Sequence, residues 1–263
     1  MRKLLLATAL TVASMSLFAV TPNIHPKHNQ VIKPLEKADS LYKNGEYLEA
    51  FKEYEVQAKL NNPQAIYNLG VMYEQGQGCK KSDKKAIQSF KKSASLGFAP
   101  ANFTLGKAYL NGTHGLTINE KTAKIHLTLA SNSGMEIATV GLSEVLLSEN
   151  IESSTTLALN LLAPLIKNGH LDATYLRALY DLKSGKETNN VKSIQTGIKA
   201  LESSSMKGHI PSLMVLGNFN ATGTFVKKDL IKAKEIFTVL DKAEIPVAKK
   251  LLEEINIEIA EMN

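Results

Sequence analysis

Cysteine and tryptophan are the scarcest residues of this chain. Its 263 residues include only Cys79 and no tryptophan, and aromatic residues make up 6%. A lone cysteine excludes a disulfide within the chain, so its stability has to come from packing. With so few aromatic side chains, the core must be built mainly from leucine, isoleucine and alanine, and the hydrophobic content of 44% is enough for a continuous one.

Several catalytic signatures are missing as well. The sequence contains no HExxH zinc pattern, no phosphate-binding loop and no dinucleotide fingerprint. The net charge of +6 is weak for a nucleic-acid-binding protein, and the lysines are interspersed with Glu and Asp. These features argue against a nucleic-acid partner and favour a solvated surface of mixed charge.

The N-terminus has the pattern of an export signal. Arg2 and Lys3 precede a run without charges from Leu4 to Val20, and small residues surround Ala19. This pattern predicts a signal peptide over 1–19, cleaved after Ala19, and a periplasmic or secreted protein with no stable membrane anchor. The alternative is an uncleaved anchor, although the apolar run is shorter than the about 20 residues of a typical membrane span. The proline-containing stretch 20–34 predicts an extended linker.

An internal repeat dominates the rest of the chain. From Ala65 to Ala101 the sequence gives a helix, a glycine-containing turn and a second helix, and then the pattern restarts. In five copies a capping residue is followed after four positions by a small residue and after eight by a large apolar one. The predicted caps are Ser82, Asn119, Ser154, Ser193 and Asp229. The small residues are Ala86, Ala123, Ala158, Gly197 and Ala233, and the large ones are Phe90, Leu127, Leu162, Leu201 and Phe237.

A glycine ends four of these copies, eleven residues after the small position, and Glu244 stands there in the fifth. The glycines are Gly97, Gly134, Gly169 and Gly208. This repeated spacing predicts two helices that cross closely at the small residue and pack against each other at the large one. An apolar pattern after Pro246 predicts a terminal capping helix over 246–263. The sequence thus predicts a repeat region over 35–248, with units at about 35–61, 65–100, 101–137, 138–172, 173–211 and 212–248.

The repeat resembles the Sel-one-like repeat family, a subclass of the tetratricopeptide-type solenoids, and residues 35–61 resemble a tetratricopeptide helix pair. The matching positions include Gly70, Gly106 and Gly217 in the first helices, each after a leucine, and Ala86, Phe90, Gly97, Ala123, Gly134 and Ala233 further on. The third and fourth copies depart from the pattern, with Leu142-Ser143 and Arg177-Ala178 in place of Leu-Gly. The resemblance implies an all-α fold, a right-handed α-solenoid of stacked antiparallel helix pairs.

No set of residues points to catalysis. Cys79 follows the turn glycines at a position where a small buried hydrophobe is expected. His170 and His209 each follow a stopping glycine, so they are one repeat position seen twice, and His114 lies in a turn insertion. We therefore assign no catalytic, cofactor-binding or metal-ligating residue and expect no cofactor.

What remains is a surface for a protein partner. In helix-pair solenoids the first helices line the inner curve, where positions facing away from the second helix supply Asn68, Lys107, Glu144 and Asn218. The main hypothesis is an exported, non-catalytic interaction scaffold, adaptor or regulator that binds a secreted effector or envelope protein. The resemblance also implies an alternative, a periplasmic immunity protein that neutralises a toxic effector such as a type VI lipase. A third hypothesis is a hydrolase of cell-wall material or of β-lactams. The cysteine-rich branch of the family to which penicillin binding and hydrolysis are attributed has cysteine pairs that are missing here.

Overall fold

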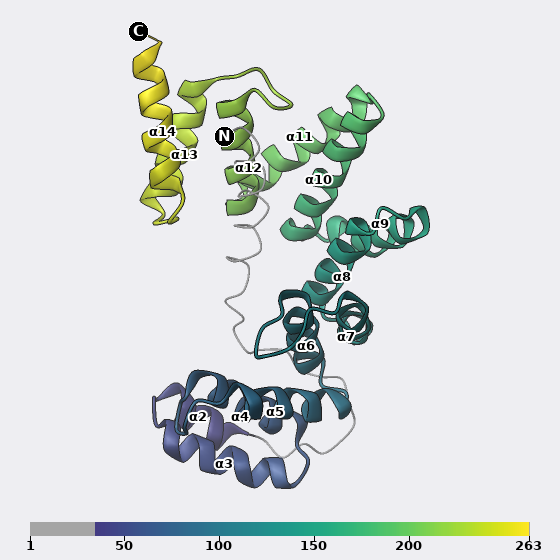
Figure 1. Ribbon diagram of the computed structural model, residues 1–263, viewed down its shortest axis with the longest axis vertical. Helices are drawn as coiled ribbons and strands as arrows, with labels where there is room; N and C mark the ends of the chain where they lie inside the picture. The colour runs from purple at the N-terminus through teal and green to yellow at the C-terminus, as the bar shows by residue number, and fades with distance from the viewer. Residues whose placement is uncertain (1–34, 263) are drawn as a thin grey trace. The chain divides into compact units, whose positions relative to one another are not determined.

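The computed structural model describes residues 35–262, and the predicted signal peptide and linker lie outside this range. The described residues form two compact units, 35–158 and 159–262, with the division inside one helix (Figure 1). No strand occurs between 35 and 262, and no helix there is long and apolar enough to cross a membrane. The thirteen helices of this range are α2 (Glu36–Lys43), α3 (Tyr47–Lys59), α4 (Pro63–Gln75), α5 (Asp83–Ser95), α6 (Ala99–Asn111), α7 (Glu120–Asn132), α8 (Glu136–Ser148), α9 (Glu152–Lys167), α10 (Leu171–Glu187), α11 (Val191–Met206), α12 (Ile210–Thr222), α13 (Leu230–Lys242) and α14 (Ala248–Glu261).

In the first unit the helices pack in sequence order. Helix α2 contacts α3, α4 contacts α5, and α6 contacts α7, while α3–α4, α5–α6 and α7–α8 join one pair to the next. The first helices of the later pairs begin at residues 63, 99 and 136, two residues before the unit boundaries expected from the sequence. Each helix thus packs on the helices before and after it, as stacked repeats require.

The two helices of a pair approach closely where a glycine of the first helix faces a large side chain of the second. A Cβ atom placed on Gly70 would lie 2.5 Å from Cε1 of Phe90, and one on Gly106 would lie 2.8 Å from Cγ of Leu127. Phe90 is fully buried and Leu127 is 1% exposed, so neither can swing aside into solvent. The close approach that the sequence predicted at these positions is therefore present in the structure.

The degenerate third and fourth copies solve the same problem differently. Ser143 takes the place of glycine in α8, where its hydroxyl donates to the Thr139 carbonyl of the same helix at 2.8 Å and lies 3.5 Å from the Ala158 carbonyl of α9. In the second unit the glycine moves to the second helix, where a Cβ on Gly197 of α11 would lie 2.8 Å from the Ala178 carbonyl of α10. A small residue on each side is kept even where the Leu-Gly motif is lost, which explains why the pairing survives.

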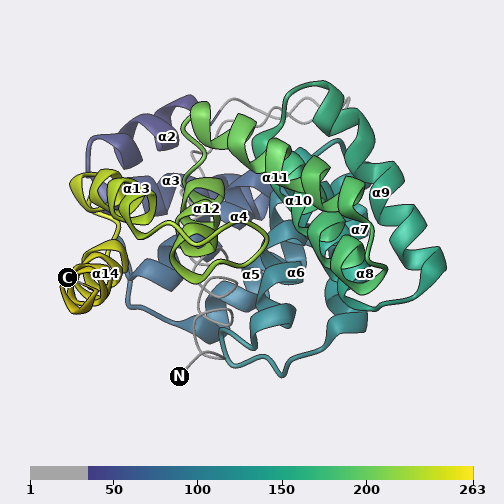
Figure 2. The same ribbon diagram turned by 90° about the horizontal axis from the view of Figure 1, so that it is seen from above.

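The remaining helices of the second unit follow the same pattern. A Cβ on Gly217 of α12 would lie 2.9 Å from Cζ of the buried Phe237 of α13. Helix α14 then packs along α13 (Figure 2), with Ala248 fully buried and Ile255 5% exposed. Because its other face carries exposed residues such as Glu253 and Glu254, α14 ends the apolar core.

Three of the five predicted helix caps are correct and two are wrong. The side chains of Ser82, Asn119 and Asp229 accept hydrogen bonds from backbone N–H groups in the first turns of α5, α7 and α13. Ser154 and Ser193 instead lie inside α9 and α11, which have 16 residues each where the other three have 13. Asn190 caps α11, and its side-chain oxygen accepts from the Ser193 N–H.

The two displaced serines bond elsewhere. The Ser193 hydroxyl donates to the Asp181 carbonyl of α10 at 2.8 Å, and the Ser154 hydroxyl donates to Glu149. Both serines therefore tie their helix to the preceding chain from inside the first turn. The longer helices begin before the position that the repeat spacing indicates, because residues N-terminal to each serine continue the helix.

The second helices end in a left-handed residue. Gly97, which ends α5, has φ +81°, and the same position after α13 is Glu244 with φ +56°. A residue with a Cβ atom is strained in this conformation, whereas glycine is not. The glycine that the sequence shows at four of five such sites therefore serves the turn into the next pair.

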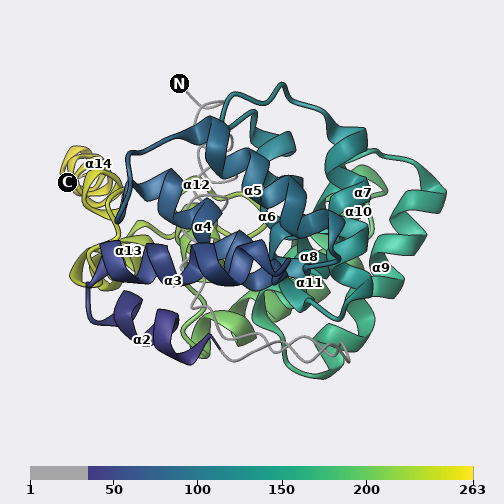
Figure 3. The same cartoon turned by 90° about the horizontal axis from the view of Figure 1, so that it is seen from below.

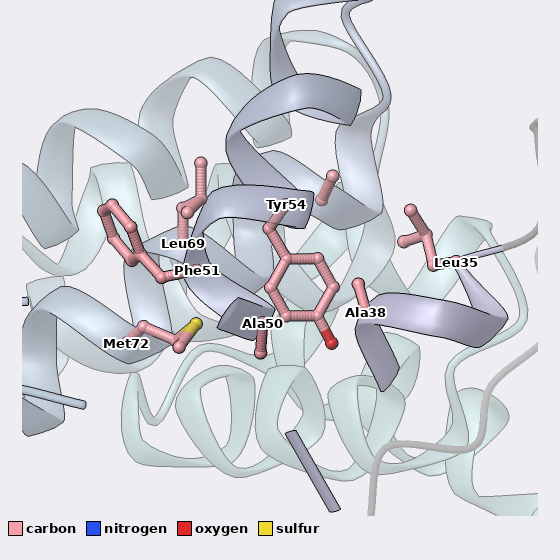
Figure 4. Close-up of a cluster of buried hydrophobic side chains, with 8 residues drawn as sticks. Leu35, Ala38, Ala50, Phe51, Tyr54, Leu69 and Met72 are labelled. Atoms are coloured by element: carbon pink, nitrogen blue, oxygen red, sulfur yellow. The ribbon is translucent and has the colours of Figure 1, made fainter. Parts of the chain in front are cut away.

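The core of the first two pairs is mixed aliphatic and aromatic. Figure 4 shows side chains of α2, α3 and α4 gathered around Tyr54, among them Ala38, Phe51, Leu69 and Met72. The hydroxyl of the buried Tyr54 has a hydrogen-bond partner, because it donates to Asp39 at 2.6 Å. Burial and the neighbouring Asp39 raise the pKa of Tyr54 above its ordinary range, so the hydroxyl stays a donor.

Alanine substitutions at two helical glycines, Gly70 and Gly141, should have different effects on the free energy of unfolding. Gly70→Ala should lower the free energy of unfolding by about 1–2 kcal/mol, because the new methyl group overlaps Phe90. Gly141→Ala should leave it unchanged or raise it by about 0.5–1 kcal/mol, since its Cβ would meet only Leu127 Cδ2 at 3.7 Å. Urea denaturation of the two variants checks this. Gly70→Val should also cost far more than Cys79→Ser, and the reverse order would contradict the packing.

Candidate functional site

The candidate functional residues are polar side chains at one register position of the first helices. Lys107 on α6, Glu144 on α8 and Asn218 on α12 each directly follow the small residue that faces the second helix. A residue one step along a helix points about 100° away from its neighbour. This register therefore turns the three side chains off the pair interface. Asn218 belongs to the second unit and is described by itself.

Lys107 is held in partly desolvated surroundings. Its side chain is half-buried, and the ammonium nitrogen lies 5.9 Å from the centroid of the Phe103 ring. Burial lowers the pKa of Lys107 to about 8. The direction of this pKa change follows from desolvation, which disfavours the charged form of the ammonium.

Glu144 is exposed on α8, yet the surrounding protein raises the pKa of its carboxyl by desolvation. The Glu144 carboxyl is therefore in contact with solvent on one side and with protein on the other. Asn218 is half-buried on α12. The first unit therefore offers one positive and one negative group of perturbed pKa, both on first helices.

Asn68 differs from the other three positions. It lies on α4 and hydrogen-bonds to the hydroxyl of Tyr54 on α3, the same hydroxyl that donates to Asp39. Its side chain is thus engaged between two helix pairs, and its assignment to a partner-binding surface stays a prediction. Its two-residue step from Gly70 turns it about 200° away, toward the preceding pair.

Cys79 is half-buried and not fully buried as the sequence indicated. Its side chain packs on the core of the first pairs, and its sulfur lies 3.5 Å from the Met72 carbonyl, to which the thiol donates. Burial raises the pKa of the Cys79 thiol. A raised pKa reduces the thiolate fraction, which is the reactive form, so this environment does not activate the sulfur.

An Asp–His–Ser set occurs in the second unit. His209 Nε2 lies 3.0 Å from Asp172 Oδ1, and His209 Nδ1 lies 2.8 Å from Ser212 Oγ. The Ser212 N–H also donates to Nδ1 at 3.3 Å, so the ring caps α12, as His170 caps α10 through Ala173. Ser212 is fully buried. A nucleophile must reach its substrate, so this geometry fits a helix cap and not a hydrolytic centre.

The other two histidines between residues 35 and 262 also bond within the protein. His114 Nε2 lies 2.7 Å from Glu74 of α4, and His126 Nδ1 lies 2.9 Å from Asn102 of α6. Burial, and then Lys91, lowers the pKa of His126, whose ring stacks on Tyr109. Among residues 35–262 no three His, Cys, Asp or Glu side chains gather as a metal site would require.

The sequence analysis did not predict the two histidine caps or the hydrogen bonds of His114 and His126. For His170 and His209 a signal existed, because both precede the first residue of a first helix, where capping side chains are preferred. For the pKa of Lys107 no signal existed, since it depends on which atoms surround the ammonium.

Three segments of the chain match a known repeat model. The Sel1 repeat matches residues 63–98, 99–135 and 210–238, which contain α4–α5, α6–α7 and most of α12–α13. The predicted all-α repeat fold is therefore confirmed, and the Sel-one-like resemblance is supported in these three segments. The degenerate copies between them, on α8–α11, are not matched.

Solved structures of the same fold are similar over most of the chain. A Sel1 repeat protein from Oxalobacter formigenes has a TM-score of 0.67 at 22% identity, with 84% of this chain and 87% of that chain covered. The c5321 protective antigen of uropathogenic Escherichia coli, which displays an SLR fold, has a TM-score of 0.54 at 20% identity, covering 84% of this chain and 56% of that one. At these identities the likeness shows the fold alone.

A curated relative is similar in sequence over part of its length. Chitin synthase regulatory factor 1 of Schizosaccharomyces pombe is 25% identical over 171 residues, which are 65% of this chain. The matched region is only 29% of that protein's length. Its regulatory role is therefore a property of a much longer protein.

The pKa of Lys107 predicts a pH dependence of stability. Its folded-state value of about 8 lies below the ordinary 10.5, so the charged lysine destabilises the folded state below pH 8, and this cost disappears as the pH rises through about 10.5. Lys107→Met should therefore raise the melting temperature at pH 7 and have less effect at pH 10. Lys199→Met, at an exposed position on α11, is the control and should show no such change. An equal effect of Lys107→Met at both pH values would contradict the assignment.

Proposed function

We propose that this protein is a non-catalytic scaffold, adaptor or regulator that binds a protein partner along the first helices of its repeats. The observation that carries the proposal is the placement of opposite charges on successive first helices, Lys107 on α6 and Glu144 on α8, each directly after the small residue of its pair. Charged groups held at fixed positions are recognised by a partner that carries complementary charges and hydrogen-bonding groups. Groups of both signs suit a protein partner better than a polyanion.

The fold supports the same proposal. Helix-pair solenoids expose long surfaces suited to peptides and domains, and their rigid helices hold side chains in fixed register. A secreted effector or an envelope protein as partner follows from the predicted export, and export with cleavage after Ala19 stays a prediction. This prediction is tested by measuring the intact mass of the protein recovered from the periplasm of an expressing bacterium, which shows whether residues 1–19 have been removed.

Partner capture tests the binding function. The protein is immobilised and challenged with periplasmic extract of its source bacterium, and retained proteins are identified by mass spectrometry. We expect one dominant partner, whose binding falls at least about tenfold in Glu144→Lys and in Lys107→Glu. Glu235→Lys on the second helix α13 reverses an exposed charge away from the first helices and should bind normally. Equal retention by all four proteins would contradict binding at the first helices.

The alternatives give different outcomes. If the captured partner is a toxic effector and co-expression of this protein rescues the intoxicated cell, the narrower immunity reading holds. Hydrolysis of nitrocefin or muropeptides by the purified protein, lost in His114→Ala or Cys79→Ser, would overturn the non-catalytic proposal.

A further inference from the structure

The positive charge of the repeat region is concentrated in one place. Residues 1–34 carry four basic and no acidic residues, so the chain's net +6 falls to +2 over 35–263. Residues 80–92 carry six lysines and one aspartate, a net charge of +5, which leaves −3 for the rest of 35–263. The expectation that lysines are interspersed with acids is wrong for this segment, which contains most of α5 and the three residues before it.

Two lysines of α5, Lys84 and Lys92, occupy helix positions that are also exposed in the other second helices of the first unit, α3 and α7. The second helices α3, α5 and α7 are labelled in Figure 3. In each of them, the positions two before and two and six after the buried alanine are exposed, and so is the position ten after it, which directly follows the helix. We call these four positions of each helix its outer row. The outer rows are Leu48, Lys52, Val56 and Leu60; Lys84, Gln88, Lys92 and Leu96; and Lys121, Ile125, Leu129 and Ser133.

All twelve outer-row residues are exposed. Six are large aliphatic residues, and Leu60, Ile125 and Val56 are 63%, 54% and 53% exposed. Four others are lysines, and no outer-row residue is acidic. Carboxylates do lie beside the rows, at Glu49, Glu55, Asp83 and Glu120. The rows themselves nevertheless combine exposed apolar area with positive charge only.

The fold does not require this composition. In α11 of the second unit the same four positions are Gln195, Lys199, Ser203 and Lys207, also exposed and without a large aliphatic residue. A second helix can therefore pack in its pair with a polar outer row. Helix pairing therefore does not require the exposed aliphatic side chains in the outer rows of α3, α5 and α7.

The composition distinguishes between two kinds of partner. Protein interfaces are enriched in Tyr, Trp, Phe, Met and Arg and depleted in Lys, whereas the outer rows contain four lysines and none of those five types. Surfaces that lie on a bilayer combine lysines, which neutralise lipid phosphates, with aliphatic side chains that enter the boundary of headgroups and acyl chains. Since no helix of 35–262 is long and apolar enough to span a membrane, the contact would be at the bilayer surface.

We propose that the outer rows of α3, α5 and α7 dock on the surface of an anionic phospholipid bilayer. The lysines of α5 and its preceding turn contact lipid phosphates, and Leu60, Leu96 and Leu129 are among the residues that enter the headgroup region. This binding is peripheral and reversible, in keeping with the expected lack of a stable membrane anchor. It uses the second helices, so it is independent of the protein partner proposed for the first helices.

Vesicle binding tests the proposal directly. The full chain is expressed, and its N-terminus is read by intact mass so that all variants are compared in one form. Co-sedimentation is measured with vesicles of phosphatidylcholine alone and with about 30 mol% phosphatidylglycerol. We expect binding to the anionic vesicles only, weakened by added salt. Lys84→Gln with Lys92→Gln should weaken it at least about tenfold, and Val56→Ser with Leu129→Ser about threefold or more.

Each pair of substitutions has a matched control. Lys199→Gln with Lys207→Gln removes the same charge from the outer row of α11, and Ile231→Ser with Val239→Ser removes exposed aliphatic side chains from that of α13. Both controls should bind anionic vesicles like the parent, and circular dichroism should show all variants folded. Equal losses in the controls, equal binding to neutral vesicles, or no binding would overturn the proposal. Binding of the rows to polyglutamate or to a second copy, without vesicle binding, would also overturn it and assign them to a protein contact.

Discussion

The whole structure depends on how closely two helix backbones approach within each pair. At Gly70 and Gly106 there is no room for a methyl group, because Phe90 and Leu127 already occupy that volume. A buried aromatic or leucine side chain can lie against a backbone only where its partner residue has almost no side chain. Close packing at one contact per pair replaces the disulfides that a chain with one cysteine does not form.

This constraint also divides the surface of the protein by chemistry. Once the small and large residues are committed to the pair interface, the residue next to the glycine on a first helix turns outward, as Lys107 does. Residues two steps from the buried alanine of a second helix face solvent, as Lys84 and Gln88 do. One helix register thus fixes two surfaces, a first-helix row of mixed charge and a second-helix row of lysine and aliphatic residues. A scaffold that binds a protein with one and a bilayer with the other would hold that partner at a membrane surface.

Much of the fold could be predicted from the sequence because its determinants are local and repeat. Ala86, Phe90 and Gly97 keep their spacing through the chain, and spacing on a helix determines which face each residue occupies. The start of α11 at Val191 could not be predicted from that spacing. The helix has extra residues at its N-terminus, which move the cap from Ser193 to Asn190 and leave the buried positions of the helix unchanged.

The site was less predictable because it depends on contacts between residues far apart in the sequence. Asn68 and Lys107 look alike as polar residues of first helices, yet one bonds to Tyr54 and the other lies beside Phe103 with a pKa of about 8.

A double-mutant cycle of Gly70→Ala and Phe90→Leu measures whether close approach of the two helix backbones determines the packing of a pair. If the two residues compete for one volume, the double variant should be more stable than the sum of the single effects predicts, by about 1 kcal/mol. Losses that simply add would contradict the close contact on which this account of the fold rests.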